Sequence, residues 1–423
     1  MRLLRLLNSC LCTYFAVFSL LILLLFIIPE KSLAITMQLT SKSYMLLQED
    51  ARDNDYAPFY EYYELDLKDI KEGLISVHSG GWLRYDLKTV SDEEREVDEL
   101  TYLYLKLSPL KDKSLTFQIG RHYVFSGVAT EQIDGLSGLW EITPLTGISI
   151  FGGLPVETEN DGRDDDYIVG GRVSQKIADK AQLGLSYLKS YNDDQSHREE
   201  MGVDTWLGPV DWMELDGLSS YNNLDNEWME HSYYVRFFPM KNLIISPLYS
   251  HVDYGSAFYN TTLSVFTPEY LGKDESITKY GGYVEYNITS WLTAIPDYIH
   301  YGYDELGNSN YYGAKLAFDV YGINSGVMLH RMAGHVKQLR YTEARVFAVK
   351  TFKKLKLALD AINLNYDEEY NGLRNMYNLN GTAEYDITKY LNLTASVDYA
   401  KTPDFTHKTS AFFKVVYNFD KTF

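Results

Sequence analysis

The chain ends in the stretch FKVVYNFDKTF, which runs from Phe413 to Phe423. Apolar and polar side chains alternate along it. A period of two is that of a β-strand whose two faces meet different surroundings. The stretch therefore predicts a terminal strand with one apolar and one polar face. Its apolar set is Phe413, Val415, Tyr417 and Phe419, and its polar set is Lys414, Asn418, Asp420 and Thr422.

The same alternation continues upstream. Residues 377–388 and 391–399 each carry large apolar side chains at odd positions and Asn, Thr, Ser, Asp or Glu at most even positions. A short turn at 389–390 separates them. Further alternating segments recur back to residue 75. This pattern predicts an all-β chain built from consecutive antiparallel hairpins.

Composition narrows the class of protein. The 423 residues carry a net charge of −19, which argues against nucleic acid because phosphates require a basic surface. The 37 tyrosines suit strands and also the membrane–water boundary. After Ile28 no apolar run approaches the ~20 residues of a spanning helix. If the mature chain lies in a membrane, it must therefore form a closed barrel, which satisfies every backbone amide in lipid.

The N-terminus has the features of a secretory signal. Arg2 and Arg5 precede an apolar run from 11 to 28, and Ser32 and Ala34 fit a cleavage site after residue 34. We expect a cleaved signal peptide at 1–34, with an uncleaved membrane anchor as the alternative because the apolar run is long. Both cysteines lie within this segment, so the mature chain would hold no thiolate site. Residues 35–58 are expected to be a periplasmic N-terminal segment.

Connections of alternating length favour an up-and-down transmembrane barrel over 59–423, with short periplasmic turns and long outer loops. Long polar connections include 126–138, 155–165 and 192–226. The turns and segments give about 18 strands, within a range of 16–20. Residues 59–67 also alternate, and we interpret them as a periplasmic or lumen-inserted piece. The acidic stretch at 157–168 resembles a calcium loop only in part, so no metal site is expected.

On this pattern one face of the strands carries charges of both signs. The hypothesis is an aqueous pore lined by these charges, because barrels of 16–18 strands are wide enough to leave a channel. The alternative is that the charges pair and fill the barrel. Glu131 and Asp134, in the 126–138 connection, are candidates for a constriction loop. The predicted lumen residues are Arg84, Lys106, Arg172, Lys176, Arg236, Lys279, Glu285, Lys315, Asp319, Lys356, Asp360, Glu384, Asp398 and Lys414.

These features resemble bacterial outer-membrane porin-like barrels over the whole mature chain. The resemblance implies that Tyr417, Phe419 and Phe423 form the signal read by the outer-membrane barrel assembly machinery, and that the protein resides in the bacterial outer membrane. Residues 120–135 are similar to segments of deltaproteobacterial barrels, some of which sheath multihaem cytochromes.

Three functions follow as hypotheses. The first is a channel for passive diffusion of small hydrophilic solutes or ions. The second is a sheath for a periplasmic multihaem cytochrome, which would supply the haem because this chain lacks a Cys-x-x-Cys-His motif. The third is an outer-membrane hydrolase, whose Ser–His pair could be assembled across strands. No Gly-x-Ser-x-Gly or His-Glu-x-x-His motif occurs, so the expectation is no enzyme and no cofactor.

Overall fold

The structure is a computed structural model that describes residues 35–49, 55–88, 96–156, 166–192, 195–258, 275–402 and 407–423. The predicted signal peptide at 1–34 and most of the acidic stretch at 157–168 lie outside the described residues.

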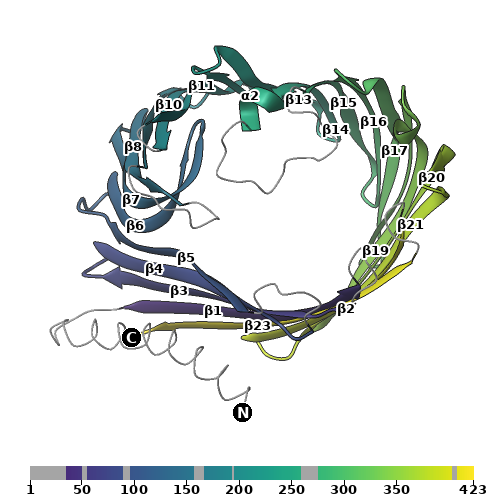
Figure 1. Cartoon of the computed structure of the whole chain (residues 1–423), viewed down its shortest axis with the longest axis horizontal. Helices are drawn as coiled ribbons and strands as arrows, with labels where there is room; N and C mark the ends of the chain where they lie inside the picture. The colour runs from purple at the N-terminus through teal and green to yellow at the C-terminus, as the bar shows by residue number, and fades with distance from the viewer. Residues whose placement is uncertain are drawn as a thin grey trace.

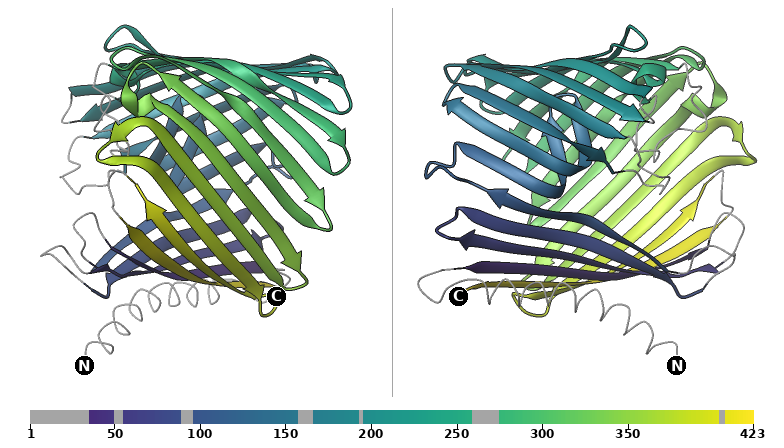
Figure 2. Two further views of the ribbon diagram at one scale, coloured as in Figure 1. Left: turned by 90° about the vertical axis from the view of Figure 1, so that its right-hand side faces the viewer. Right: turned by 60° about the vertical axis from the view of Figure 1, so that its left-hand side comes forward.

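The described strands form one closed antiparallel barrel (Figure 1). Each strand from β3 to β23 pairs with the next along the chain, and β1 closes the ring by pairing with both β23 and β3. Figure 2 shows that the strands cross the wall at a steep tilt, as closure of a barrel requires. The strands are β1 (Thr36–Glu49), β2 (Asp55–Tyr56), β3 (Pro58–Ile70), β4 (Ile75–Asp86), β5 (Glu96–Leu107), β6 (Leu115–Ser126), β7 (Ala129–Thr143), β8 (Thr146–Pro155), β9 (Tyr167–Ile177), β10 (Ala181–Asn192), β11 (Gln195–Val210), β12 (Met213–Asn222), β13 (Glu227–Met240), β14 (Leu243–Asp253), β15 (Ser276–Thr289), β16 (Leu292–Tyr303), β17 (Gly307–Val320), β18 (Ile323–Gly334), β19 (Arg340–Phe352), β20 (Leu355–Tyr370), β21 (Leu373–Asp386), β22 (Leu391–Lys401) and β23 (Lys408–Thr422).

The up-and-down barrel is confirmed, but the predicted count of 18 strands is wrong. The ring holds 22 strands, namely β1 and β3 to β23, while the two-residue β2 only extends the end of β1. The additional strands are β1 and β3, in the region expected to precede the barrel or insert into it, and β11 and β12, within the predicted 192–226 loop.

The alternation of β1 is hidden by polar residues on its outer face. Ser41 and Ser43 lie between Leu39 and Met45 on that face, and both hydroxyls donate hydrogen bonds to the carboxylate of Glu61 on β3. Because these polar groups satisfy one another, the strand tolerates them. The expectation of a separate periplasmic segment at 35–58 is therefore wrong for Thr36–Glu49, which closes the barrel wall.

The two faces of the wall differ in chemistry. On the outer face Val346, Ala361 and Leu379 face one another across three strands, with Val346 and Leu379 about half exposed, as an apolar belt requires. On the same face Leu65, Leu67 and Ile70 pack against Met37, Leu39 and Val77.

The described part also contains the short helix α2 (Tyr254–Phe258) and the 3-10 helix η2 (Lys337–Leu339), and no helix there is long and apolar enough to cross a membrane.

Candidate functional site: a hairpin inside the barrel

The strand register places the predicted lumen charges on one face of the wall. Asp360, for example, is directly opposite Asn380, which is opposite Asp398, while the adjacent residues Leu359 and Leu379 point to the apolar side. The same holds for the other predicted charges: Arg84, Lys106, Arg172, Lys176, Arg236, Lys279, Glu285, Lys315, Asp319, Lys356, Glu384 and Lys414.

Side chains on this polar face also contact one another across an intervening strand. Arg172 on β9 donates to Asp204 on β11 at 2.8 Å, passing over Gly184 of β10. His330 on β18 meets Asp297 on β16 at 2.6 Å, passing over Gly313 of β17. A Cβ at either glycine would overlap these side chains. Phe151 and Leu188 lie on this same face and contact the β6–β7 hairpin, which Figure 1 shows inside the ring, so this face is the inner face.

Many of the inner-face charges are paired within the wall. Arg236 lies 2.8 Å from Glu214, and Asp360 lies 2.7 Å from Arg345. The Lys315 ammonium sits over the ring of Phe347 at 5.0 Å. Asp398 accepts a hydrogen bond from Asn378 at 2.6 Å. The inner face is therefore polar and charged, and several of its charged side chains have a partner within the wall.

The β6–β7 hairpin leaves the wall and enters the barrel. Pairing of β6 with β5 stops at Arg121, and pairing of β7 with β8 stops at Ile133. The bend falls at Gly120, whose φ of 119° suits glycine and whose missing Cβ would overlap the Leu103 carbonyl oxygen. We call residues 121–134 the inner hairpin. Figure 1 shows it inside the ring, next to β8 and β10.

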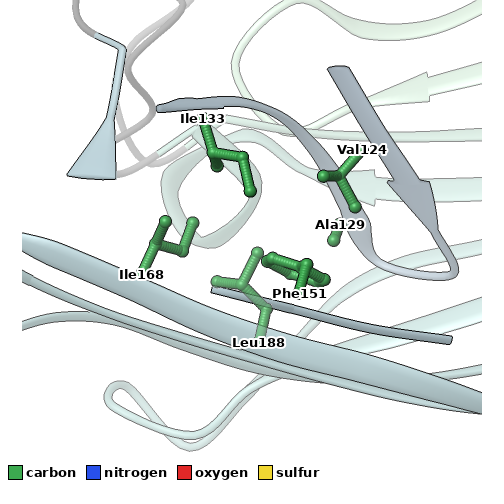
Figure 3. Packing of buried hydrophobic residues seen from close by; sticks show 6 residues of the cluster. All are labelled: Val124, Ala129, Ile133, Phe151, Ile168 and Leu188. Atoms are coloured by element: carbon green, nitrogen blue, oxygen red, sulfur yellow. The ribbon is translucent and has the colours of Figure 1, made fainter. Parts of the chain in front are cut away.

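One side of the inner hairpin packs against the inner wall (Figure 3). Val124, Ala129 and Ile133 contact an apolar patch made by Phe151, Ile168 and Leu188, which come from β8, β9 and β10. Ala129, Ile133 and Leu188 have no exposed surface. At the tip, the Val128 amide donates to Ser186 Oγ at 3.0 Å. The hairpin is thus a docked element with its own small core.

Beside this core, a buried arginine clamps the hairpin to β11. Arg198 donates from Nη1 to Glu131 Oε1 and from Nε to Glu200 Oε1, each at 2.7 Å. Their side chains are no more than 9% exposed. Two carboxylates converge on one guanidinium, so the loss of Arg198 would leave two buried charges facing each other. Glu131, predicted as a constriction residue, is therefore an anchor of the inner hairpin.

The opposite edge of the hairpin covers the break between β5 and β6. Arg121 binds Asp134 through two hydrogen bonds of 2.7 and 2.8 Å and also donates to the Leu100 carbonyl at 3.1 Å. Gln132 donates to the Thr101 carbonyl. These side chains replace the β6 backbone as partners of β5. Asp134 therefore lies at this break, which we call the seam, and faces away from the packed core. The predicted 126–138 loop is the hairpin tip and most of β7.

Two aromatic rings lie on the side of the hairpin that faces away from its core. Tyr123 and Phe125 flank Val124, so they project to the opposite side of the strand. Their rings stack at a centroid distance of 6.2 Å, and Phe125 is 75% exposed. The docked hairpin therefore presents an aromatic edge together with its polar seam.

The other predicted site residues take these positions. Tyr417 and Phe419 lie on β23 opposite Ser41 and Leu39, on the outer face, and the Phe423 amide donates to the Ile35 carbonyl at 2.9 Å. Recognition by the assembly machinery stays a prediction. In the part of the chain that the structure describes, no group of three His, Cys, Asp or Glu side chains is arranged to hold a metal ion.

Sequence reasoning missed Arg198 and Glu200 because they fall in the predicted 192–226 loop. A signal was present, since Arg198, Glu200 and Asp204 repeat at even spacing while Met201 and Val203 occupy the intervening face. The high polarity of the upper part of β11 obscured it. That part lies against the inner hairpin, where paired charges take the place of apolar residues.

Comparisons with known proteins show the fold. No protein-family model matches the chain, and no curated protein matches it in sequence. The translocation pore of the P pilus usher PapC matches with a TM-score of 0.51 at 9% identity, over 90% of this chain and 99% of that one. A chain of the E. coli PapC-PapD-PapK-PapG pilus tip intermediate matches at 0.55 and 10% identity, over 93% of this chain and 62% of that one. Acinetobacter baumannii OccAB4 matches at 0.47 and 9% identity, over 93% of this chain and all of that one. The chain thus has the barrel fold of outer-membrane proteins, with a distant likeness to the usher pore.

Proposed function

We propose that the protein is an outer-membrane channel for passive diffusion of small hydrophilic solutes, narrowed by the inner hairpin. The observation that carries the proposal is the docked hairpin itself. A closed barrel of this strand number encloses a wide lumen, which in outer-membrane transporters is occupied by a plug. Here a short segment of the wall is folded inward and fixed by Arg198, and this segment narrows the lumen.

The chemistry of the inner face favours the passage of polar rather than apolar solutes. Charged pairs such as Arg172–Asp204 and Arg236–Glu214 offer donors and acceptors of both signs along the wall. Such a lining orients dipolar solutes and excludes apolar ones, because the latter would displace water from charged groups at a cost.

Reconstitution of the purified protein into a planar bilayer tests the proposal. Stepwise ion conductance is expected from each inserted barrel. A variant lacking residues 122–133 should give larger steps, because the constricting element is gone. A correctly folded barrel that inserts but stays electrically silent would contradict the proposal. Silence combined with co-purification of a haem protein would instead support the hypothesis of a sheath around a cytochrome.

A further inference from the structure

Three side chains near the short β3–β4 turn form a hydrogen-bonded relay on the inner face. Ser76 and His78 are two residues apart on β4 and so share a face, and Asp66 on β3 is the direct register partner of His78. Ser76 Oγ lies 2.8 Å from His78 Nε2, and His78 Nδ1 lies 2.6 Å from Asp66 Oδ1. Each histidine nitrogen therefore has its own partner.

The surroundings hold the imidazole in this orientation. Its ring stacks on Tyr104 at 4.7 Å with an interplanar angle of 16°, and its side chain is only 13% exposed. Lys68 Nζ forms an ion pair with the other oxygen of Asp66 at 3.0 Å. A charged Asp66 can only accept a hydrogen bond, so Nδ1 carries the proton and Nε2 presents its lone pair to Ser76.

This is the arrangement of a serine nucleophile, a general base and an orienting carboxylate. We propose that Ser76 and His78, positioned by Asp66, hydrolyse water-soluble carboxylic esters that enter the lumen. Bilayer lipid is excluded as the substrate because the three residues face the inside, on the side of Glu64 and Lys42 and away from the apolar belt.

The reaction proceeds in two balanced steps. Ser76 Oγ attacks the ester carbonyl and gives its proton to His78 Nε2. The tetrahedral intermediate then expels the alcohol, which takes that proton. Water next attacks the acyl-serine, His78 receives the proton of the water, and the carboxylic acid leaves as Ser76 regains a proton. Lys106, directly opposite Ser76 in the register, supplies positive charge beside the developing oxyanion.

The experiment uses the full-length protein in detergent with a fluorophosphonate probe and p-nitrophenyl butyrate. Mass spectrometry should locate the phosphonyl adduct on Ser76, and Ser76→Ala should abolish both the adduct and hydrolysis. The matched control is Ser219→Ala. Ser219 also contacts a histidine, His231 Nδ1 at 2.8 Å, but in the described part of the chain no carboxylate binds that imidazole, so this variant should behave as wild type.

Asp66→Asn tests the positioning role. It should lower kcat roughly 10⁴-fold because the amide favours the wrong imidazole tautomer, and it should also change the pH profile of kcat, which a purely structural loss would not do. Unchanged conductance of Ser76→Ala would show that the barrel is folded and that the channel does not depend on the relay. Absence of an adduct in the conducting wild-type protein, or an equal adduct in Ser76→Ala, would overturn the proposal.

Discussion

The β19–β20 pair and the β5–β6 pair differ in how the backbone groups of neighbouring wall strands find their hydrogen-bond partners. The β19–β20 ladder is continuous from Tyr341–Tyr366 to Phe352–Leu355, so nearly every backbone group finds its partner in the next strand. The β5–β6 ladder covers only Leu103–Arg121 to Leu107–Phe117, and the rest of β6 turns inward. A barrel wall can therefore lack part of one interstrand hydrogen-bond ladder and hold the freed hairpin in its lumen.

The missing ladder is replaced by side chains. Arg121 and Gln132 reach the carbonyls of Leu100 and Thr101, and Arg198 fixes the opposite side of the inner hairpin. These groups are few and specific, whereas the backbone ladder of β19–β20 is distributed and independent of side-chain identity. The stability of the β5–β6 region should therefore be most sensitive to substitutions of polar residues. The stability of the β19–β20 region should be most sensitive to substitutions in the outer apolar belt.

Arg198→Met should have the largest effect. Breaking a buried ion pair costs about 3–5 kcal/mol, and here it leaves Glu131 and Glu200 uncompensated. The hairpin should undock, giving noisy channels of higher conductance and new protease cleavage within residues 121–134. Arg345→Met, which breaks a half-exposed pair with Asp360, is the control and should leave conductance steady. Quiet, wild-type channels from Arg198→Met would show that the clamp does not hold the hairpin.

Val346→Arg tests the continuous region. This residue is 54% exposed on the outer face near the middle of β19, where an arginine costs about 2–4 kcal/mol in lipid. Unfolding in urea from lipid vesicles should show that loss, while Val346→Met should be close to neutral. The neighbouring Arg345 is tolerated because it points inward to Asp360. Full stability of Val346→Arg would contradict the assignment of the two faces.

Arg121→Met should have a smaller and local effect. It removes charge-assisted hydrogen bonds, one of which is worth about 1.5–3 kcal/mol, and exposes the β5 edge at Leu100. Amide hydrogen exchange in residues 96–101 should become faster, with exchange in β19 and β20 as the internal reference. Equal exchange in variant and wild type would mean that the seam is not held by this side chain.

Arg236→Gln should have the smallest effect. Its contacts with Glu214 and Asp216 are about half exposed, and such pairs contribute about 0–1 kcal/mol. Stability should hardly change, while removal of one positive inner-face charge should shift ion selectivity slightly toward cations in bilayer recordings. A loss of stability as large as that of Arg198→Met would show that exposed and buried inner-face pairs do not differ as proposed.

How well the strands could be predicted from the sequence differed along the chain. In β21 to β23 the outer face is apolar in almost every pair, so Leu379, Val397 and Phe413 were readable as one belt. In β1 the serines at 41 and 43 interrupt the belt, and in β11 the paired charges at 198 and 200 resemble a solvated loop. Each missed strand carries polar groups whose partners lie on another strand, which a single strand cannot reveal.

The candidate site was predictable to a similar degree. Alternation groups the predicted charges on one face because side-chain direction depends only on parity along a strand. It could not show which charges pair, since Arg172 meets Asp204 across an intervening strand. Likewise, Glu131 was recognised as a constriction candidate, but its partner Arg198 lies 67 residues away.

The sequence by itself determined the class of structure, because a period of two repeated along the chain, with no long apolar helix after the N-terminal run, leaves a two-faced closed sheet as the arrangement that lipid permits. Only the tertiary structure decided how many strands close the ring, which hairpin turns inward, and that Ser76, His78 and Asp66 meet. Those outcomes depend on curvature and on contacts between distant strands, whereas the alternation is a local property of each strand.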